Sequence, residues 1–310
     1  MRKRLVLTAA ALLLATACSD IDLGPVWAEY ELPGGPAQEL RAVAASATGE
    51  VWVVGRGGEA WFFDGETWER RDSGFAYELT GAAAEENGGL WTSGADSDER
   101  GHILRYDPDE GWSELPLPGS AAFLADLAAT ADGTLLAVGS KGQVWRGSSA
   151  GFELLWQDSD YIWRAVDIHE TSEALVVGGR LSTGNGAFLI LECSGADFTV
   201  EELSGGRLED CALTDSDAGW AVNADGCIYR YDSGTMQMVA DTGVLLRGLA
   251  VEPDRSDALW LCGLSGALVH YSGGELEYPD SPTDENLHDL VLTGADEGWA
   301  AAKTRLLVYR

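Results

Sequence analysis

Basic residues are scarce in this sequence of 310 residues: 20 Lys and Arg stand against 51 Asp and Glu, a formal net charge of −31 at pH 7. Such an acidic chain repels polyanions, which excludes nucleic acid as a general partner. Histidine is also rare, and none of His102, His169, His270 and His288 forms an H-x-x-H or H-E-x-x-H zinc pattern. The chain also lacks G-x-S-x-G, Walker and EF-hand motifs. We therefore expect no metal and no cofactor.

The N-terminus has no apolar stretch long enough for a membrane span. Arg2, Lys3 and Arg4 precede 13 apolar residues, 5–17, which are too few to cross a bilayer. Small residues then lead to Cys18, so residues 1–17 are predicted to be a secretory signal peptide. This segment resembles a bacterial lipoprotein signal, whose cysteine becomes lipidated, although Ala15 stands where that family prefers leucine. The alternative is ordinary cleavage at the same bond, which leaves Cys18 free.

Lipidation of Cys18 predicts an exported protein anchored in the bacterial cell envelope, because more than one acyl chain gives stable membrane attachment. Ser19 after the cysteine, rather than aspartate, favours the outer membrane. Residues 18–25 then form a short tether, and residues 26–310 form one domain. Without the three basic residues of the signal, 17 basic residues remain against 51 acidic ones, a net charge of about −34.

Cysteine is the next scarce residue type. Besides Cys18, the chain contains Cys193, Cys211, Cys227 and Cys262, whose spacings match no zinc pattern. Export makes disulfides permissible, and four cysteines allow three pairings that the sequence does not separate. Small buried thiols within strands are an equal alternative.

A short hydrophobic strand followed by a turn recurs seven times along the chain. Its copies occupy residues 51–55, 90–94, 135–139, 174–178, 219–223, 259–263 and 298–302. Successive copies are separated by 39, 45, 39, 45, 40 and 39 residues. A period near forty built from short strands is typical of a β-propeller, in which each repeat forms one four-stranded blade. The sequence therefore predicts an all-β, seven-bladed propeller.

The strand pattern inside the repeats predicts how the ring closes. In the first complete repeat, strands are expected at 40–45, 51–54, 59–63 and from residue 67 onward. The seventh repeat ends after its third strand, 306–310, and the hydrophobic segment 26–32 supplies the missing fourth strand. Tryptophans that recur in the second strands are expected in the core between blades rather than in a sugar-binding platform. These are Trp52, Trp91, Trp220, Trp260 and Trp299.

One turn sequence carries a family resemblance. Residues 63–68 resemble a degenerate Asp-box of bacterial-neuraminidase (BNR) repeats, and Tyr106-Asp107 with Gly111-Trp112 is a looser echo. With the recurring hydrophobic-Gly-x-x-Gly hairpin, the whole mature chain is similar to BNR/YVTN-type propellers, which include the photosystem II assembly and stability factor family. The resemblance implies a binding or assembly scaffold with a protein or peptide partner, and not an enzyme. We expect the chain to be a monomer.

The predicted fold places the charges on two faces. The first strand of each blade lines the central channel, and the hairpins between second and third strands lie on one face, called here the top face. The turns between first and second strands lie on the opposite, bottom face and are strongly acidic. The scarce cations gather on the top face and are predicted to bind an acidic peptide or a carboxylate ligand. They are Arg41, Arg56, Lys141, Arg164, Arg180, Arg247, His288, Lys303 and Arg305.

Within this set, Arg41, Arg164, Arg247 and His288 hold one equivalent position, at the start of the first strand of four blades. The alternative is that the cations only neutralise nearby acidic residues. These residues are Glu39, Asp126, Asp158, Asp160, Glu209, Asp210, Asp284 and Asp289.

Two other functions are considered. A sialidase-like glycoside hydrolase needs a tyrosine nucleophile helped by a glutamate. Tyr77 and Tyr161 fall near the top face, but no spacing identifies a glutamate partner. A purely structural envelope protein is the other alternative. The direction of the chain adds one expectation: the N-terminal strand starts at the bottom face, so a lipid on Cys18 holds the acidic face toward the membrane and presents the basic mouth outward.

Overall fold

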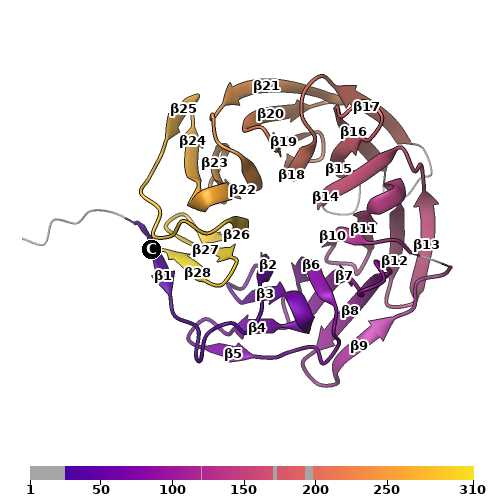
Figure 1. The fold of residues 1–310 in the computed structure, drawn as a ribbon, viewed down its shortest axis with the longest axis vertical. Helices are drawn as coiled ribbons and strands as arrows, with labels where there is room; N and C mark the ends of the chain where they lie inside the picture. Colours follow the sequence, from indigo (N-terminus) through magenta and orange to yellow (C-terminus); the bar gives the residue numbers. More distant parts are fainter. Residues whose placement is uncertain (1–24, 120, 170–172, 193–197) are drawn as a thin grey trace, which may run out of the picture.

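The protein is a closed ring of seven sheets around a central axis (Figure 1). The computed structural model describes residues 25–119, 121–169, 173–192 and 198–310. Each sheet has four antiparallel strands, and the helical elements in the described ranges are three 3₁₀ turns of three residues each. The predicted all-β, seven-bladed propeller is confirmed.

Six blades follow the chain from the channel outward. Blade 1 contains β2 (Leu40–Ala45), β3 (Val51–Gly55), β4 (Ala60–Phe63) and β5 (Trp68–Arg70), and blade 2 contains β6 (Glu78–Ala84), β7 (Leu90–Ala95), β8 (Gly101–Asp107) and β9 (Gly111–Leu115). Blade 3 contains β10 (Leu124–Ala129), β11 (Leu135–Gly139), β12 (Val144–Ser148) and β13 (Gly151–Trp156), and blade 4 contains β14 (Tyr161–His169), β15 (Glu173–Arg180), β16 (Gly186–Glu192) and β17 (Phe198–Leu203). Blade 5 contains β18 (Leu208–Asp215), β19 (Ala218–Asn223), β20 (Cys227–Asp232) and β21 (Thr235–Asp241), and blade 6 contains β22 (Leu246–Glu252), β23 (Arg255–Gly263), β24 (Leu268–Ser272) and β25 (Glu275–Glu277).

Blade 7 joins the two ends of the chain. Its strands β26 (Leu287–Gly294), β27 (Glu297–Ala302) and β28 (Leu306–Tyr309) are completed by β1 (Trp27–Tyr30). Trp27 lies opposite Tyr309, and the backbone N–H of Val26 donates to the carbonyl of Arg310 at 3.0 Å. The predicted closure by the N-terminal strand is therefore confirmed (Figure 1). Because β1 is antiparallel to β28 and β28 is antiparallel to β27, β1 begins on the bottom face.

The core lies between neighbouring blades. The second strands are buried on both sides, because each is covered by the two adjacent sheets; every residue of β3 and β11 is buried. The five recurring tryptophans are at most 5% exposed, which confirms their predicted core positions. Two of them also link blades, since the indole N–H of Trp52 donates to Gly88 and that of Trp220 donates to Ser256 in the next blade. Burial of such large aromatic groups accounts for much of the stability of the ring.

A β-bulge interrupts the first strand of every blade at the same place. In blade 1 the register shifts between Leu40 and Ala42, so Arg41 is the extra residue. The register shifts at the same place in the other six blades, so the residue equivalent to Arg41 is the extra residue in each of them. A bulge bends its strand and re-aims the extra side chain. The seven bulges therefore determine which side chains meet at one level of the channel.

Candidate binding site in the central channel

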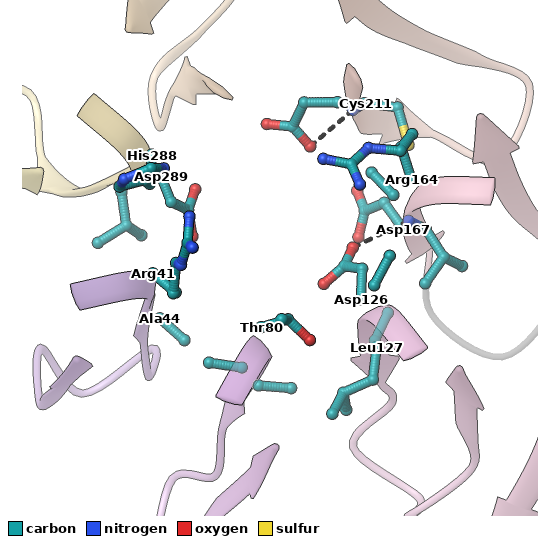
Figure 2. A pocket seen from close by; sticks show the side chains of 18 of the residues that line it. Arg41, Ala44, Thr80, Asp126, Leu127, Arg164, Asp167, Cys211, His288 and Asp289 are labelled. Atoms are coloured by element: carbon teal, nitrogen blue, oxygen red, sulfur yellow. Dashed lines mark hydrogen bonds between the residues drawn. The ribbon is translucent and has the colours of Figure 1, made fainter. Parts of the chain in front are cut away.

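The central channel holds a cavity of about 600 Å³ that is open to solvent. Figure 2 shows side chains reaching it from opposite walls, with Arg41, His288 and Asp289 on one side and Arg164 and Asp167 on the other. The seven bulge residues all line it: Arg41, Thr80, Ala125, Arg164, Glu209, Arg247 and His288. The equivalent placement of Arg41, Arg164, Arg247 and His288 is thus present in the structure.

Three arginines surround one buried carboxylate on the wall of blades 4 to 6. Arg164 Nε donates to Glu209 Oε2 at 3.2 Å, and Arg247 Nη1 donates to the same oxygen at 3.3 Å. Arg207 donates through Nε, at 2.9 Å, and through Nη2, at 2.5 Å, to Glu209 Oε1. The Glu209 side chain is 1% exposed, whereas the arginines keep about a third of their surface in solvent. We call these four residues the Glu209 cluster.

The Glu209 cluster has a surplus of positive charge, because one carboxylate faces three guanidinium groups. The charges of the cluster also act on the pKa of Arg164, which is lowered mainly by burial. Burial lowers this pKa, the charges of Arg207 and Arg247 lower it further, and Glu209 acts in the opposite direction. An added anion at this wall would relieve the repulsion among the arginines.

The opposite wall, at blades 7, 1 and 2, is closer to charge balance. Arg41 pairs with Glu78 at 2.9 Å and with Glu39 at 3.4 Å, and Arg56 pairs with the same two carboxylates at 3.3 and 3.6 Å. His288 Nε2 lies 3.1 Å from Glu39 Oε1. Burial, reinforced by the charge of Arg41, lowers the pKa of His288, so the imidazole is neutral at pH 7. We call these five residues the Glu39 cluster.

Four aspartates on the channel walls connect neighbouring blades. Each accepts a backbone N–H from the first strand of the next blade: Asp289 from Val43, Asp126 from Val166, Asp167 from Leu213 and Asp210 from Leu249, at 2.7 to 3.0 Å. Among the described residues none of the four pairs with an arginine or lysine. The direct partners of Asp126, Asp210 and Asp289 are therefore backbone amides and not the predicted cations.

These aspartates have raised pKa values although part of each side chain faces the cavity. Burial by the surrounding protein raises the pKa of Asp126 to about 7 and that of Asp289 to about 6. The donated backbone N–H groups favour the charged form and act in the opposite direction. Burial also raises the pKa of Asp167 and Asp210, and the charge of Asp289 adds to the effect at Asp210.

The remaining predicted cations do not line the central cavity, because the hairpins that carry them lie one strand farther from the axis. Arg180 pairs with Asp160 at 2.6 Å and with Glu202 at 2.7 Å. Arg305 pairs with Glu29 and with Glu285. Lys141 and Lys303 pair with no carboxylate in the described ranges. Neutralisation thus accounts for Arg180 and Arg305, and it accounts for Arg56 within the Glu39 cluster.

Three charged residues were missed from the sequence: Glu78 of the Glu39 cluster, Arg207 of the Glu209 cluster and Asp167 on the channel wall. In blade 5, Arg207 precedes Leu208, the first residue of β18, and Glu209 follows it. Blade 1 has the opposite order of charges, because Glu39 precedes the equivalent leucine and Arg41 follows it. An alignment of the seven repeats that began one residue earlier would have included Arg207. Asp167 lies three residues beyond Arg164 on β14, and no other blade has an acidic residue at that position of its first strand.

Both top-face tyrosines do meet a glutamate. The hydroxyl of Tyr77 donates to Glu114 at 3.4 Å and that of Tyr161 to Glu202 at 3.3 Å. Neither tyrosine lines the central cavity. Burial, together with the charge of the paired glutamate, raises both pKa values, which disfavours the phenolate that a nucleophile requires.

Three of the five cysteines lie in the described residues. Cys211, Cys227 and Cys262 are free, and Cys211 and Cys262 are buried. Cys193 and Cys18 lie outside the described residues. No group of His, Cys, Asp and Glu suited to a metal ion occurs in the described ranges. The same ranges contain no helix of the length and apolarity that a membrane span requires.

The fold and its central cavity define a seven-bladed β-propeller with a charged channel. No protein-family profile matches this chain, and no curated protein matches it. Solved structures do. "YCF48 bound to D1 peptide" is 19% identical with a TM-score of 0.70 and covers 91% of this chain and 94% of its own. The virginiamycin B lyase from Staphylococcus aureus is 14% identical with a TM-score of 0.75, covering 92% and 99%.

A third similar structure is the WD40 β-propeller domain of Doa1, with 14% identity, a TM-score of 0.72 and coverage of 91% and 95%. Identities this low show the shared fold and not a shared activity. The three similar structures include a peptide complex and a lyase, so the fold by itself does not decide between scaffold and enzyme.

Proposed function

We propose that this protein is a non-catalytic binding or assembly scaffold of the bacterial cell envelope, and that its channel mouth binds a carboxylate-bearing segment of a protein partner. One observation carries the proposal: the Glu209 cluster, in which three guanidinium groups share one carboxylate, opens onto a cavity of about 600 Å³. Guanidinium groups bind carboxylates in paired hydrogen bonds. The partly exposed edges of Arg164 and Arg247 provide the donors.

The acidic composition of the rest of the chain makes a positively charged site unusual, and such a site selects for an acidic ligand. The protein carries a net charge of −31, so an acidic segment is repelled by most of its surface. A solved propeller of the same fold holds a peptide, which agrees with this kind of binding as an analogy. The acidic segment is expected to lie against blades 4 to 6, since the Glu39 cluster on the other wall is nearly neutral.

The proposal includes lipidation at Cys18 and attachment to the outer membrane. The described chain enters the ring on the bottom face, at β1. About eight residues of extended chain separate Cys18 from that strand, at most roughly 25–30 Å. The anchor then holds the acidic face toward the bilayer and leaves the mouth accessible to a partner. Reagent labelling of an Arg164→Cys variant in intact envelopes checks this orientation, and protection by the membrane would contradict it.

Binding is tested with a short, labelled oligoglutamate peptide and the matched oligoglutamine peptide. We expect the purified mature protein to bind the first and not the second, with affinity that falls as salt rises. Replacing Arg164 and Arg247 with glutamine should weaken binding at least about tenfold, because each charge-assisted hydrogen bond to a carboxylate contributes roughly 1.5–3 kcal/mol. Arg230→Gln is the control, since Arg230 lies on β20 and donates to Ser256 outside the channel. Equal affinity for both peptides would refute the proposal.

A further inference from the structure

A second cavity, of about 440 Å³, lies outside the channel on blade 3. Its apolar side is formed by Trp145 on β12 and by Phe152 and Leu154 on β13, and Leu154 is 41% exposed. Its polar side contains Lys141 and Gln143, from the top-face hairpin between β11 and β12. An open cavity with an apolar wall and few polar groups is the usual form of a small-ligand site.

Gln143 is buried, at 4% exposure, and the orientation of its amide is fixed. Its oxygen Oε1 accepts the backbone N–H of Ala122 at 2.8 Å and the indole N–H of Trp145 at 3.3 Å. Because both partners are donors, the oxygen must face them and the NH₂ group must point elsewhere. Within the described residues this NH₂ group has no partner, although Gln143 lines the cavity. The cavity therefore presents an NH₂ group that is held in place by the Oε1 contacts, is accessible from the cavity and has no acceptor in the described protein.

Blade 1 has a different side chain at the position that Gln143 occupies in blade 3. Glu59 stands there, and its oxygen Oε1 accepts the N–H groups of Ala37 and Trp61, both at 2.9 Å. Its second oxygen accepts the N–H of Gln38 at 2.5 Å. A carboxylate thus satisfies this position completely in blade 1, whereas the amide in blade 3 uses one oxygen and leaves two N–H groups.

Lys141 places a positive charge at the same cavity. Its side chain is exposed, and its backbone has the left-handed conformation, with φ of 57°. Lys141 pairs with no carboxylate in the described part of the chain. The one acidic residue at the cavity, Glu153, is paired with Arg146 at 2.6 Å. The local charge is therefore positive in a protein of net charge −31.

From these contacts we infer that the blade 3 cavity binds an apolar carboxylate. The carboxylate accepts hydrogen bonds from the Gln143 NH₂ group and the Lys141 ammonium group, and the apolar part packs against Trp145, Phe152 and Leu154. Two sources share this chemistry: a free small carboxylic acid, and the C-terminus of a polypeptide that ends in an apolar residue. This site is separate from the channel and does not depend on the function proposed there.

The test uses N-acetyl-L-phenylalanine, its uncharged amide, and a short peptide that ends in phenylalanine. Binding to the mature protein is measured by calorimetry, and the side-chain amide signals of Gln143 and the indole signal of Trp145 are followed by NMR. We expect the acid to bind and to shift these signals, and the amide to bind at least about tenfold more weakly. If the peptide binds more tightly than the free acid, the source is a polypeptide C-terminus; the reverse order indicates a small acid.

Two variants separate the proposed contacts from folding. Gln143→Glu retains the acceptor for Ala122 and Trp145, as Glu59 does in blade 1, but loses the NH₂ donors and repels a carboxylate. Lys141→Asn keeps a residue that tolerates positive φ, and Lys303→Asn is its matched control on blade 7. We expect binding to be lost in Gln143→Glu, to weaken about fivefold in Lys141→Asn and to remain unchanged in Lys303→Asn. Equal binding of the acid and the amide, or no binding of any probe up to about 10 mM, would overturn the inference.

Discussion

The Glu209 cluster predicts a specific loss of stability when its single carboxylate is neutralised. Glu209→Gln keeps the size of the side chain but leaves Arg164, Arg207 and Arg247 without a counter-charge. Removing one partner of a buried ion pair costs about 3–5 kcal/mol. Because each arginine keeps about a third of its surface in solvent, screening reduces this to roughly 2 kcal/mol. For a chain of this size that lowers the melting temperature by about 4 °C.

The assay is thermal denaturation followed by circular dichroism, in low salt and in added sulfate. The loss in Glu209→Gln should shrink with sulfate, because the anion compensates the three guanidinium groups. Glu39→Gln is the matched control, since Arg41 and Arg56 keep Glu78 as a partner and the loss should be smaller. The oligoglutamate peptide should also bind Glu209→Gln more tightly than the wild-type protein. Equal melting temperatures of the two variants in both salts would refute the charge assignment.

Two further predictions concern the aspartates and the closure of the ring. The raised pKa values of Asp126 and Asp289, about 7 and about 6, mean that the folded protein holds protons that the unfolded chain releases above pH 4. The free energy of unfolding should therefore rise as pH falls from 8 to 5.5, by up to about 1.4 kcal/mol per pH unit for each proton taken up. Urea denaturation should show a smaller rise in Asp126→Asn than in the wild-type protein. An equal rise would contradict the assignment. Trp27 is 6% exposed and packs against Trp260 and Tyr309, with ring centroids 5.6 and 5.3 Å away. Trp27→Ala should cost about 3–5 kcal/mol and lower the melting temperature by about 6–10 °C, and an unchanged melting curve would show that the β1–β28 contact does not stabilise the ring.

The sequence was sufficient for the fold because each blade repeats one local pattern. Hydrophobic second strands and hairpin turns are short-range features, and seven copies at similar spacing reinforce one another. The first blade shows the agreement: strand 40–45 was predicted at the residues of β2. The equivalent position of Arg41, Arg164, Arg247 and His288 could also be read, since it needs only the alignment of repeats.

Contacts between blades could not be read in the same way. The partners of Glu209 come from residues 164, 207 and 247, and a side chain at the end of a loop can turn toward the channel or away from it. The bulges add to the difficulty, because an extra residue breaks the alternation that assigns side chains to faces. The NH₂ group of Gln143 that has no protein acceptor could not be predicted from the sequence either, since it depends on which N–H groups lie near the side chain.

The hydrogen bonds between Val26 and Arg310 bring the residue before β1 into direct contact with the residue after β28. A circularly permuted gene could therefore join these two positions through a very short linker and begin the chain in any loop between blades. Each such permutant would place its new ends at a different point of the circumference, where a fluorescent protein or a surface tether could be attached. The closed ring thus offers each of its seven blades as a starting point for an engineered chain.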